Sequence, residues 1–248
     1  MTKNLIDIFN DYFEMVPAVS DELKEEVYKL RYQVYCVETG FEDPKLYSNG
    51  MEFDEFDSHS AHYLIYHRNL DVYMATTRLI LPEPDNPDKL FPIEIHSQID
   101  NFDALKDISR DSLAEASRFC VSKQFRRRKN ELNSITGATN GANGANGVQN
   151  VFTHEERRIF PHLTLALIAC VIKMSHENNI HNFFAVMEPG LIRFFSTLGI
   201  DFTEIGPLAY YHGNRRPCII KVSDLLAGVA KKDINNWDML TNKGEFSN

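Results

Sequence analysis

The chain has little of what a membrane protein, a secreted protein or a zinc-binding protein requires. No run of about 18 apolar residues occurs among its 248 residues, so we expect no membrane span. The first residues, MTKNLIDIFNDYFEM, carry no basic segment ahead of an apolar one, which argues against a secretory signal peptide. The cysteines are widely spaced without a CxxC pair, and the histidines lack zinc spacing. We therefore expect cytosolic thiols and no metal site; the cysteines are Cys36, Cys120, Cys170 and Cys218.

The charge balance argues against a general affinity for nucleic acid. The net charge is −9, while a hydrophobic content of 43% and a charged content of 25% are ordinary for a globular protein. The charge is uneven, because residues 42–57 are acidic and KQFRRRK at residues 123–129 carries five positive charges. A local basic patch on an acidic protein indicates a specific anionic partner more than a nucleic acid.

Periodicity and turn signals predict a chain of alternating helices and strands. Apolar residues at helical spacing predict helices, one of them after the N-cap candidate Ser20, and two alternating segments joined by a short turn predict a hairpin. In the strand expected at 111–122, the alternation places Ala114 and Ala116 on one face and, if it continues, Arg118 with them. The expected helices are 5–15, 20–37, 155–179 (broken or started by Pro161), 188–199 and 224–232, and the expected strands are 61–68, 71–82, 111–122, 181–187, 201–206 and 215–222.

A low-complexity stretch, GATNGANGANGVQN, lacks the apolar residues needed for packing and predicts a mobile loop at about residues 134–150. The chain shows no internal repeat and no composition break that would separate domains. We therefore expect a single α/β domain over residues 1–248, with a mixed central sheet flanked by helices.

The acidic loop before the first hairpin predicts half of a charge network. MEFDEFDSHSAHYLI, at residues 51–65, places Glu52, Asp54, Glu55 and Asp57 directly before a strand. Elements expected to adjoin in the sheet carry the other members, which are Arg31, Arg78, Glu115 and Arg118. Buried charges persist only when they are paired and hydrogen-bonded. The alternative is that each of these side chains is separately exposed to water.

Four segments, taken in order, resemble the acyl-homoserine lactone synthase family: RYQVYCVETGF, EFDEFDSHSAHYLI, MATTRLILP and EASRF. The resemblance covers about the first half of the chain, and Phe41 stands where that family usually has tryptophan. The residues that carry it are Arg31, Tyr35, Phe41, Asp54, Asp57, Arg78, Glu115, Ser117, Arg118 and Phe119.

The second half is more similar to other acyltransferases. YYHGNRRPCIIKV, at residues 210–222, resembles long-chain N-acyl amino acid synthases and the acyltransferases associated with exosortase/PEP-CTERM systems. All of these relatives share the GNAT-like acyltransferase fold. The resemblance implies a cytoplasmic enzyme, with no permanently bound cofactor, that takes a fatty acyl group from acyl carrier protein and places it on an amine.

The resemblance also implies roles for the residues of the EASRF strand. Glu115 is the candidate base for an amine attacking a thioester. Backbone N–H groups from Phe119 to Val121 are candidate donors to the oxyanion if a bulge frees them, with Ser117 and Arg118 on the same catalytic wall. For the acceptor side we name Phe41, and an amino-acid carboxylate could bind any of Arg31, Arg78 and Arg118. Asp54 and Asp57 either hold the acceptor's ammonium or only hold the arginines.

The basic run bears on the acyl donor. In ordinary GNAT enzymes a Gly-rich turn, Q/R-x-x-G-x-G/A, binds the pyrophosphate of coenzyme A at this place. Gln124 begins such a motif, but arginines occupy the glycine positions, which disfavours acyl-CoA. Cations suit an acidic acyl carrier protein and its phosphopantetheine, so we expect docking at Lys123, Arg126, Arg127, Arg128 and Lys129. A solvated basic loop is the alternative.

Apolar segments in the second half could line an acyl tunnel or simply form the core. These segments are the helix at 159–174, FFAVM at 183–187, and Phe194 with Phe195. Cys36 and Cys120 are weighed as nucleophiles, but neither has a family-specific context, so we expect buried thiols.

The sequence therefore predicts a GNAT-like acyltransferase that makes an N-acyl amino acid or a similar lipid amide. Two alternatives stay open. The first is an acyl-homoserine lactone synthase that uses S-adenosylmethionine as acceptor. The second is a non-catalytic GNAT-like domain that binds acyl carrier protein or a lipid signal.

Overall fold

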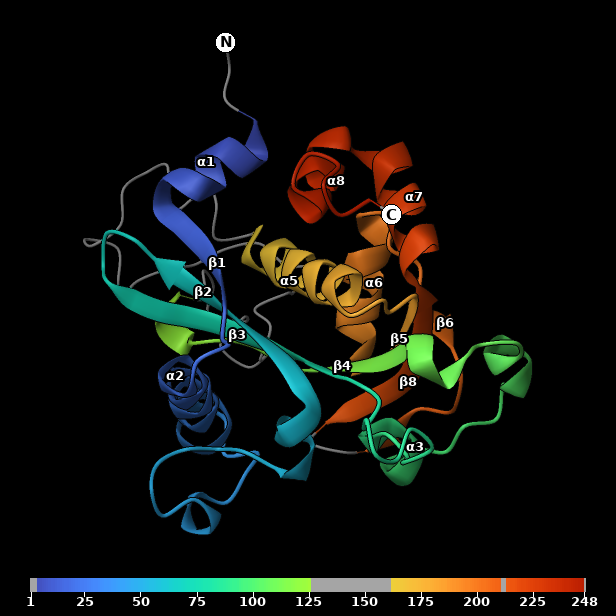
Figure 1. The fold of residues 1–248 in the computed structure, drawn as a ribbon, viewed down its shortest axis with the longest axis horizontal. Helices are drawn as coiled ribbons and strands as arrows, with labels where there is room; N and C mark the ends of the chain where they lie inside the picture. The colour runs from blue at the N-terminus through green and yellow to red at the C-terminus, as the bar shows by residue number, and fades with distance from the viewer. Residues whose placement is uncertain (1–3, 126–161, 211–212, 248) are drawn as a thin grey trace.

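The protein is described here by a computed structural model that covers residues 4–125, 162–210 and 213–247. Its centre is one mixed sheet, with strand order β1-β2-β3-β4-β5-β8-β6 and with β7 paired to β8 (Figure 1). All neighbouring strands are antiparallel except β4 and β5, which are parallel. The strands are β1 (Phe13–Pro17), β2 (Ser60–His67), β3 (Val72–Ile80), β4 (Leu113–Val121), β5 (Asn182–Met187), β6 (Thr203–Glu204), β7 (Ala209–Tyr210) and β8 (Asn214–Lys221).

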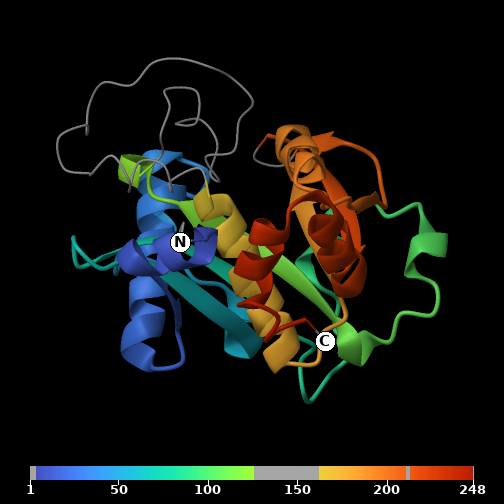
Figure 2. The same cartoon turned by 90° about the horizontal axis from the view of Figure 1, so that it is seen from above.

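Helices cover both faces of the sheet (Figure 2). The α-helices are α1 (Leu5–Tyr12), α2 (Asp21–Tyr32), α3 (Pro92–His96), α5 (Leu163–Glu177), α6 (Pro189–Thr197), α7 (Val222–Lys232) and α8 (Ile234–Thr241). A π-helix, η1 (Gln33–Glu38), continues α2, and the short 3-10 helices are η2 (Pro44–Leu46), η3 (Glu55–His59), η4 (Phe102–Leu105), η5 (Arg110–Ser112) and η6 (Lys123–Phe125). Helix α2 packs on β2 and β3 from one side, and α5 packs on the same strands from the other.

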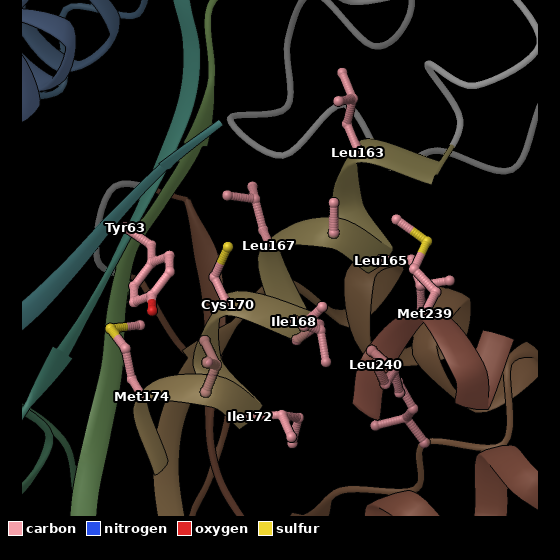
Figure 3. Close-up of a cluster of buried hydrophobic side chains, with 14 of the residues drawn as sticks. Tyr63, Leu163, Leu165, Leu167, Ile168, Cys170, Ile172, Met174, Met239 and Leu240 are labelled. Carbon is pink, nitrogen blue, oxygen red and sulfur yellow. The ribbon is translucent and has the colours of Figure 1, made fainter. Parts of the chain in front are cut away.

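Helix α5 is the centre of the larger core. Its residues LTLALIACVIKMSHE are apolar on nearly every face, as expected for a helix surrounded by other elements. In Figure 3 its side chains point toward Tyr63 of β2 on one side and toward Met239 and Leu240 of α8 on the other. These three side chains are at most 1% exposed, so α5 is held between the sheet and the C-terminal helices.

Strands β4 and β5 separate partway along their length. Their parallel ladder runs from the Leu113–Asn182 pair to the Ala116–Ala185 pair, and β4 then continues to Val121 with β3 as its partner. A register shift in the β3–β4 ladder lies opposite Arg118, whose φ of +50° is unusual for a residue other than glycine. The strand is therefore bulged at the point where it leaves β5.

The expected mixed α/β sheet flanked by helices is confirmed. The helix expected at 5–15 is wrong beyond Tyr12, because Phe13–Pro17 pairs with β2 as an edge strand, a position that tolerates Pro17. Of the helix expected at 155–179, residues 155–161 lie outside the described residues, as does the Gly/Asn-rich stretch at about 134–150. Helices α3 and α8 were not predicted, since each is short and α3 lies in a segment without clear periodicity.

Candidate active site

Two carboxylates are fixed by local backbone geometry where the acidic loop enters η3. Asp54 is the N-cap of η3, and its Oδ1 accepts from the backbone N–H of Phe56 at 3.0 Å. The side chain of Asp57 reciprocates, because its Oδ2 accepts from the Asp54 N–H at 2.7 Å. This reciprocal capping box turns both carboxylates toward the sheet. Glu52, just before it, is 0% exposed.

Arg31 binds two of these carboxylates from the end of α2. Its Nε lies 2.5 Å from Glu52 Oε2, and its two terminal nitrogens lie 2.7 Å and 3.1 Å from the oxygens of Asp57. The Arg31 side chain is 0% exposed. An arginine this deep is tolerable only because its planar donors are used by carboxylates.

Arg78 and Arg118 complete the charge network from the sheet. Arg78 of β3 donates to Asp54 Oδ1 at 2.6 Å and to Asp57 Oδ1 at 2.9 Å, and its Nε donates to Ser117 Oγ at 2.9 Å. Arg118 of β4 donates to Glu52 Oε1 at 2.8 Å and to Asp54 Oδ2 at 3.2 Å. We define the charge network as Arg31, Glu52, Asp54, Asp57, Arg78 and Arg118.

The network keeps Glu52 and Asp57 ionised. Burial alone would raise the pKa of Glu52, but the guanidinium groups of Arg31 and Arg118 outweigh it and lower the pKa to about 2. Burial opposes the same effect at Asp57, where Arg31 and Arg78 lower the pKa below its usual range. His62 lies behind Asp57, with Nε2 3.5 Å from Asp57 Oδ1, and burial lowers its pKa to about 3. Its imidazole is therefore neutral at physiological pH.

A cavity of about 340 Å³ opens where β4 and β5 separate. Its polar wall includes Asp54, Arg78, Ser117 and Arg118. Its apolar wall is made by side chains from β5, α5, α6 and the segment after α6, among them Ile168, Val171, Phe183, Leu191, Phe195 and Phe202. One cavity therefore joins a charged region to a region suited to a hydrocarbon chain.

Glu115 of β4 also lines this cavity. Its side chain is buried at 4% exposure, and its Oε2 accepts from the backbone N–H of Ile93 in α3 at 2.8 Å. Burial raises the pKa of Glu115 to about 7, and this backbone hydrogen bond and the charges of Arg78 and Arg118 only partly oppose the effect. At neutral pH this carboxyl is thus able both to accept and to release a proton.

The bulge in β4 brings Ser117 and Arg118 to the same side of the sheet. Ser117 binds Arg78 and Arg118 binds Glu52, although consecutive residues of a regular strand face opposite sides. The prediction that Arg118 follows the alternation of Ala114 and Ala116 is wrong for this reason. After the bulge, Phe119 faces α6, where its ring lies 6.4 Å from that of Phe195.

The structure brings most of the sequence-predicted site residues to the cavity. Those that line it are Phe41, Asp54, Arg78, Glu115, Ser117, Arg118 and Phe119. Arg31 and Asp57 lie behind this wall, where they bind each other and other members of the charge network. The prediction that Arg31 contacts the substrate therefore needs correction, because its guanidinium is enclosed by Glu52 and Asp57.

Two further predictions concern Val121 and the basic run. The side chain of Val121 is 2% exposed within the core formed with α5 and does not line the cavity, and the role of its backbone N–H as an oxyanion donor stays a prediction. Lys123 begins η6 and is exposed, with its backbone N–H donating to Glu38 Oε2 at 2.8 Å. Arg126, Arg127, Arg128 and Lys129 lie outside the described residues.

Only part of each apolar segment lines the cavity, and its use as an acyl tunnel stays a prediction. From α5, Ile168 and Val171 line the cavity, while the other apolar residues of that helix that the structure describes form core. From FFAVM, every residue except Phe184 lines it, and of the Phe194–Phe195 pair only Phe195 does.

Sequence reasoning missed two residues of this site. Glu52 was seen as part of the acidic loop but was not placed in the site, although it binds both Arg31 and Arg118. Arg215 of β8 lines the cavity and belongs to the YYHGNRRPCIIKV segment, whose resemblance could have pointed to it.

Thiol chemistry and a metal site find no support among the described residues. All four cysteines are buried and outside any disulfide, and burial raises the pKa of Cys36 to about 11. That thiol is therefore protonated at neutral pH. Within the same residues, no group of histidine, cysteine, aspartate and glutamate side chains could hold a metal ion. None of the helices described has the length and apolar character to cross a membrane.

The chain was compared with known families and structures. Residues 30–134 match the family model described as the acetyltransferase (GNAT) domain. A sequence search of curated proteins finds no significant match. The matched segment contains the end of α2, with Arg31, and all of η3, β2, β3 and β4, and therefore every member of the charge network.

Solved structures similar to the whole chain have low sequence identity. The acyl-homoserine lactone (AHL) synthase LasI is 14% identical with a TM-score of 0.58, covering 89% of this chain and 95% of that chain. The CoA-dependent acyl-homoserine lactone synthase BjaI, with MTA, is 18% identical with a TM-score of 0.54, covering 93% and 88%. FeeM, an N-acyl amino acid synthase from uncultured soil microbes, is 14% identical with a TM-score of 0.50, covering 89% and 96%.

These comparisons carry no link to exosortase/PEP-CTERM systems, so that part of the resemblance stays a prediction. Structural likeness at such identities establishes the fold, and the family model matches residues 30–134 within it. The chain has the GNAT-like acyltransferase fold, with the GNAT acetyltransferase domain matched over residues 30–134.

Proposed function

We propose that the chain is an N-acyltransferase that moves a fatty acyl group from the thioester of acyl carrier protein to the amine of an amino acid. The observation that carries this proposal is Glu115, a buried carboxyl with a pKa near 7 in the wall of a cavity that is charged on one side and apolar on the other. A general base works best when its pKa lies close to the pH of the reaction. The product is an N-acyl amino acid.

Glu115 is the proposed general base. An amino acid carries an ammonium at neutral pH, and one proton must leave before the nitrogen can attack the thioester carbonyl carbon. The C–N bond then forms, the nitrogen loses a second proton, and the C–S bond breaks. The departing thiolate takes up one proton to become the phosphopantetheine thiol, and the other passes to solvent, so that Glu115 returns to its carboxylate form.

The tetrahedral intermediate needs donors for its oxyanion. We assign this role to backbone N–H groups of β4 between Phe119 and Val121, of which Phe119 belongs to a residue that lines the cavity. The support is that the ladder with β5 ends at Ala116, and that the bulge at Arg118 redirects the strand. The acyl chain is assigned to the apolar wall formed with α5 and α6.

We assign the members of the charge network that lie behind the cavity wall to holding its arginines in place. Arg31 and Asp57 fix the position of Arg78, while Glu52 fixes Arg118, so the polar wall is held rigid while substrates change. Asp54 touches the cavity as well as both arginines. It is therefore the carboxylate of the network that could also meet the acceptor's ammonium.

Acyl carrier protein is the proposed donor, with acyl-CoA less favoured and no permanently bound cofactor required. The support is the sequence of residues 123–129, in which Arg127 and Lys129 stand where GNAT enzymes carry the glycines of a pyrophosphate-binding turn. A carrier-protein donor places the reaction in the cytoplasm. Reversing the charges of Arg126, Arg127 and Arg128 should raise the KM for the carrier-protein donor more than that for a short pantetheine thioester. Equal effects on both donors would count against docking.

An acyl-homoserine lactone synthase that uses S-adenosylmethionine is the second candidate. It is favoured by the residues of the four N-terminal motifs, because they form one charge network at the cavity. Both candidates require the same amide-forming step, and they differ in the acceptor and in whether the product closes to a ring.

One assay separates the candidates. The protein is incubated with long-chain acyl carrier protein and either a pool of amino acids or S-adenosylmethionine, and products are identified by mass spectrometry while thiol release is followed. An N-acyl amino acid supports the first candidate, and turnover with S-adenosylmethionine alone supports the second. If no amine gives thiol release, the protein is a non-catalytic binding domain and the proposal is wrong.

A further inference from the structure

Arg215 stands apart from the other arginines of the cavity. It lies in β8, next to the short hairpin with β7, and its side chain forms part of the cavity wall. Its Nε is buried without a hydrogen-bond partner, and no carboxylate among the residues that the structure describes pairs with its guanidinium. A buried guanidinium N–H without an acceptor is costly, so the position is suited to an anionic ligand.

The other candidate arginines are already occupied. Arg31, Arg78 and Arg118 each donate to two carboxylates of the charge network. A substrate carboxylate could use one of them fully only by displacing an internal carboxylate, which would leave that group buried with fewer partners. The neighbour of Arg215, Arg216, also has a buried Nε without a hydrogen-bond partner, but Arg216 forms an ion pair with Glu204 and does not line the cavity.

The surroundings of Arg215 hold its charge within reach of the reacting region. Its guanidinium carbon lies 5.8 Å from the centre of the Phe41 ring, a cation–π contact that orients the planar group. Tyr35, Glu115 and Arg118 line the same cavity. Two acidic residues, Glu42 and Glu188, also line it, but neither forms an ion pair with Arg215.

We propose that Arg215 binds the α-carboxylate of the acceptor amino acid and so selects α-amino acids over simple amines. This inference rests on the proposed N-acyltransferase function. Two parallel N–H···O bonds from a planar guanidinium fix both oxygens of a carboxylate. With the carboxylate held at one side of the cavity, the neighbouring amine can be directed toward Glu115 and the thioester.

The same binding mode bears on which product forms. Closing a homoserine lactone from S-adenosylmethionine requires a carboxylate oxygen to attack the γ-carbon of the same molecule while the bond from that carbon to the sulfonium sulfur breaks. A carboxylate with both oxygens held by Arg215 is a weaker nucleophile for this attack. The clamp therefore favours an open-chain N-acyl amino acid.

The test compares each amino acid with its own amide, which keeps the amine and removes the carboxylate charge. Leucine with leucinamide, and phenylalanine with phenylalaninamide, are supplied with acyl carrier protein as acyl donor. The wild-type protein should prefer the acids, and Arg215→Gln should lower kcat/KM for the acids by on the order of 100-fold, since a buried charged contact is lost. Turnover of the amides should change by less than about threefold.

Two controls make the result specific. Arg216→Gln alters the adjacent arginine of the same strand and should leave the preference for acids over amides unchanged. Arg215→Lys keeps the charge without the planar pair of donors, and should recover part of the preference. A wild-type protein that acylates neither acids nor amides would reject the proposed function itself. A wild-type preference that survives in Arg215→Gln, or equal losses for acids and amides, would overturn the role of Arg215 alone.

Discussion

Glu52 and Glu115 are both buried, but their surroundings shift the pKa of the two carboxyl groups in opposite directions. Glu52 accepts from two guanidinium groups, and its pKa is lowered to about 2. Glu115 accepts from a single backbone N–H, and its pKa is raised to about 7. Both side chains are at most 4% exposed, so burial alone does not decide the charge state. The number and charge of the hydrogen-bond donors decide it.

The difference between these two pKa values separates a structural role from a role in proton transfer. A carboxylate with a pKa far below the working pH holds arginines in place but cannot exchange a proton during a reaction. A carboxylate with a pKa near 7 can exchange one, and such displaced pairs are typical of acid–base sites. We therefore assign the charge network to structure and Glu115 to proton transfer, and four predictions test this division.

Breaking the charge network should have the largest effect. Arg31→Met leaves Glu52 and Asp57 buried with fewer donors, which should lower the free energy of unfolding by about 4 kcal/mol. Urea unfolding followed by circular dichroism measures this loss. A change below about 1 kcal/mol would show that the network contributes little to folding.

Lowering the pH should reduce the contribution of the charge network to the free energy of unfolding and increase that of Glu115. The pKa of Glu52 is lowered, so its contribution is present above about pH 4.5 and is lost as the pH falls toward 2, on the order of 3 kcal/mol in total. His62, with its lowered pKa, adds a loss that begins below about pH 6.5. Glu115 acts in the opposite direction, because the stability from its raised pKa is full below about pH 4.5 and is lost as the pH rises through 7.

Urea unfolding at a series of pH values checks these signs. The decline in stability from pH 6.5 to 4.5 should be steeper in Glu115→Gln than in the wild type, since the variant lacks the opposing contribution. An identical slope in both proteins would mean that the pKa of Glu115 is not raised in the folded state.

Removing the proposed base should stop turnover without unfolding the protein. Glu115→Gln keeps an acceptor for the Ile93 N–H but cannot take a proton, so turnover should fall at least about 100-fold. The wild-type kcat/KM should rise with pH to a plateau above about 7. At pH 8 the variant should be as stable as the wild type or more so, because it has no carboxylate to ionise in the buried site. Unchanged turnover would remove Glu115 as the base.

The smallest effect is expected at an exposed pair with similar chemistry. Arg68 and Glu14 lie 2.8 Å apart, the same distance as between Arg118 and Glu52. The side chains of Arg68 and Glu14, however, are 44% and 46% exposed. Arg68→Gln should change the free energy of unfolding by less than about 1 kcal/mol, measured in the same urea series. A loss as large as that of Arg31→Met would show that burial is not what gives the network its importance.

Local patterns predicted much of the fold. Ser20 was expected to cap the second helix and does so, accepting from the Leu23 N–H at 3.3 Å. The hairpin of β2 and β3, the strand β4 and the helix α6 also follow from spacing and turn residues, because these signals act over only a few positions. The edge strand β1 was missed because Phe13–Pro17 becomes extended only through pairing with β2.

The site was less accessible to such reasoning. The short motifs indicated a charge network, but which arginines are enclosed depends on side chains more than 20 positions away, as for Arg31 with Glu52. Arg118 was placed on the wrong face because a bulge is a property of two paired strands. Arg215 could not be distinguished from Arg216 by sequence, since both are neighbours in one strand and only the cavity separates them.

The sequence by itself determined most of the longer helices and strands, the apolar character of α5 and the set of charged residues that must find partners, because spacing, caps and the cost of burying a charge are local or compositional. Only the tertiary structure decided which charges are paired and where β4 and β5 separate. It also decided that the pKa of Glu115 is raised and that Arg215 lacks a carboxylate partner among the described residues. The physical reason is that pairing and desolvation depend on distances between side chains that are remote along the chain.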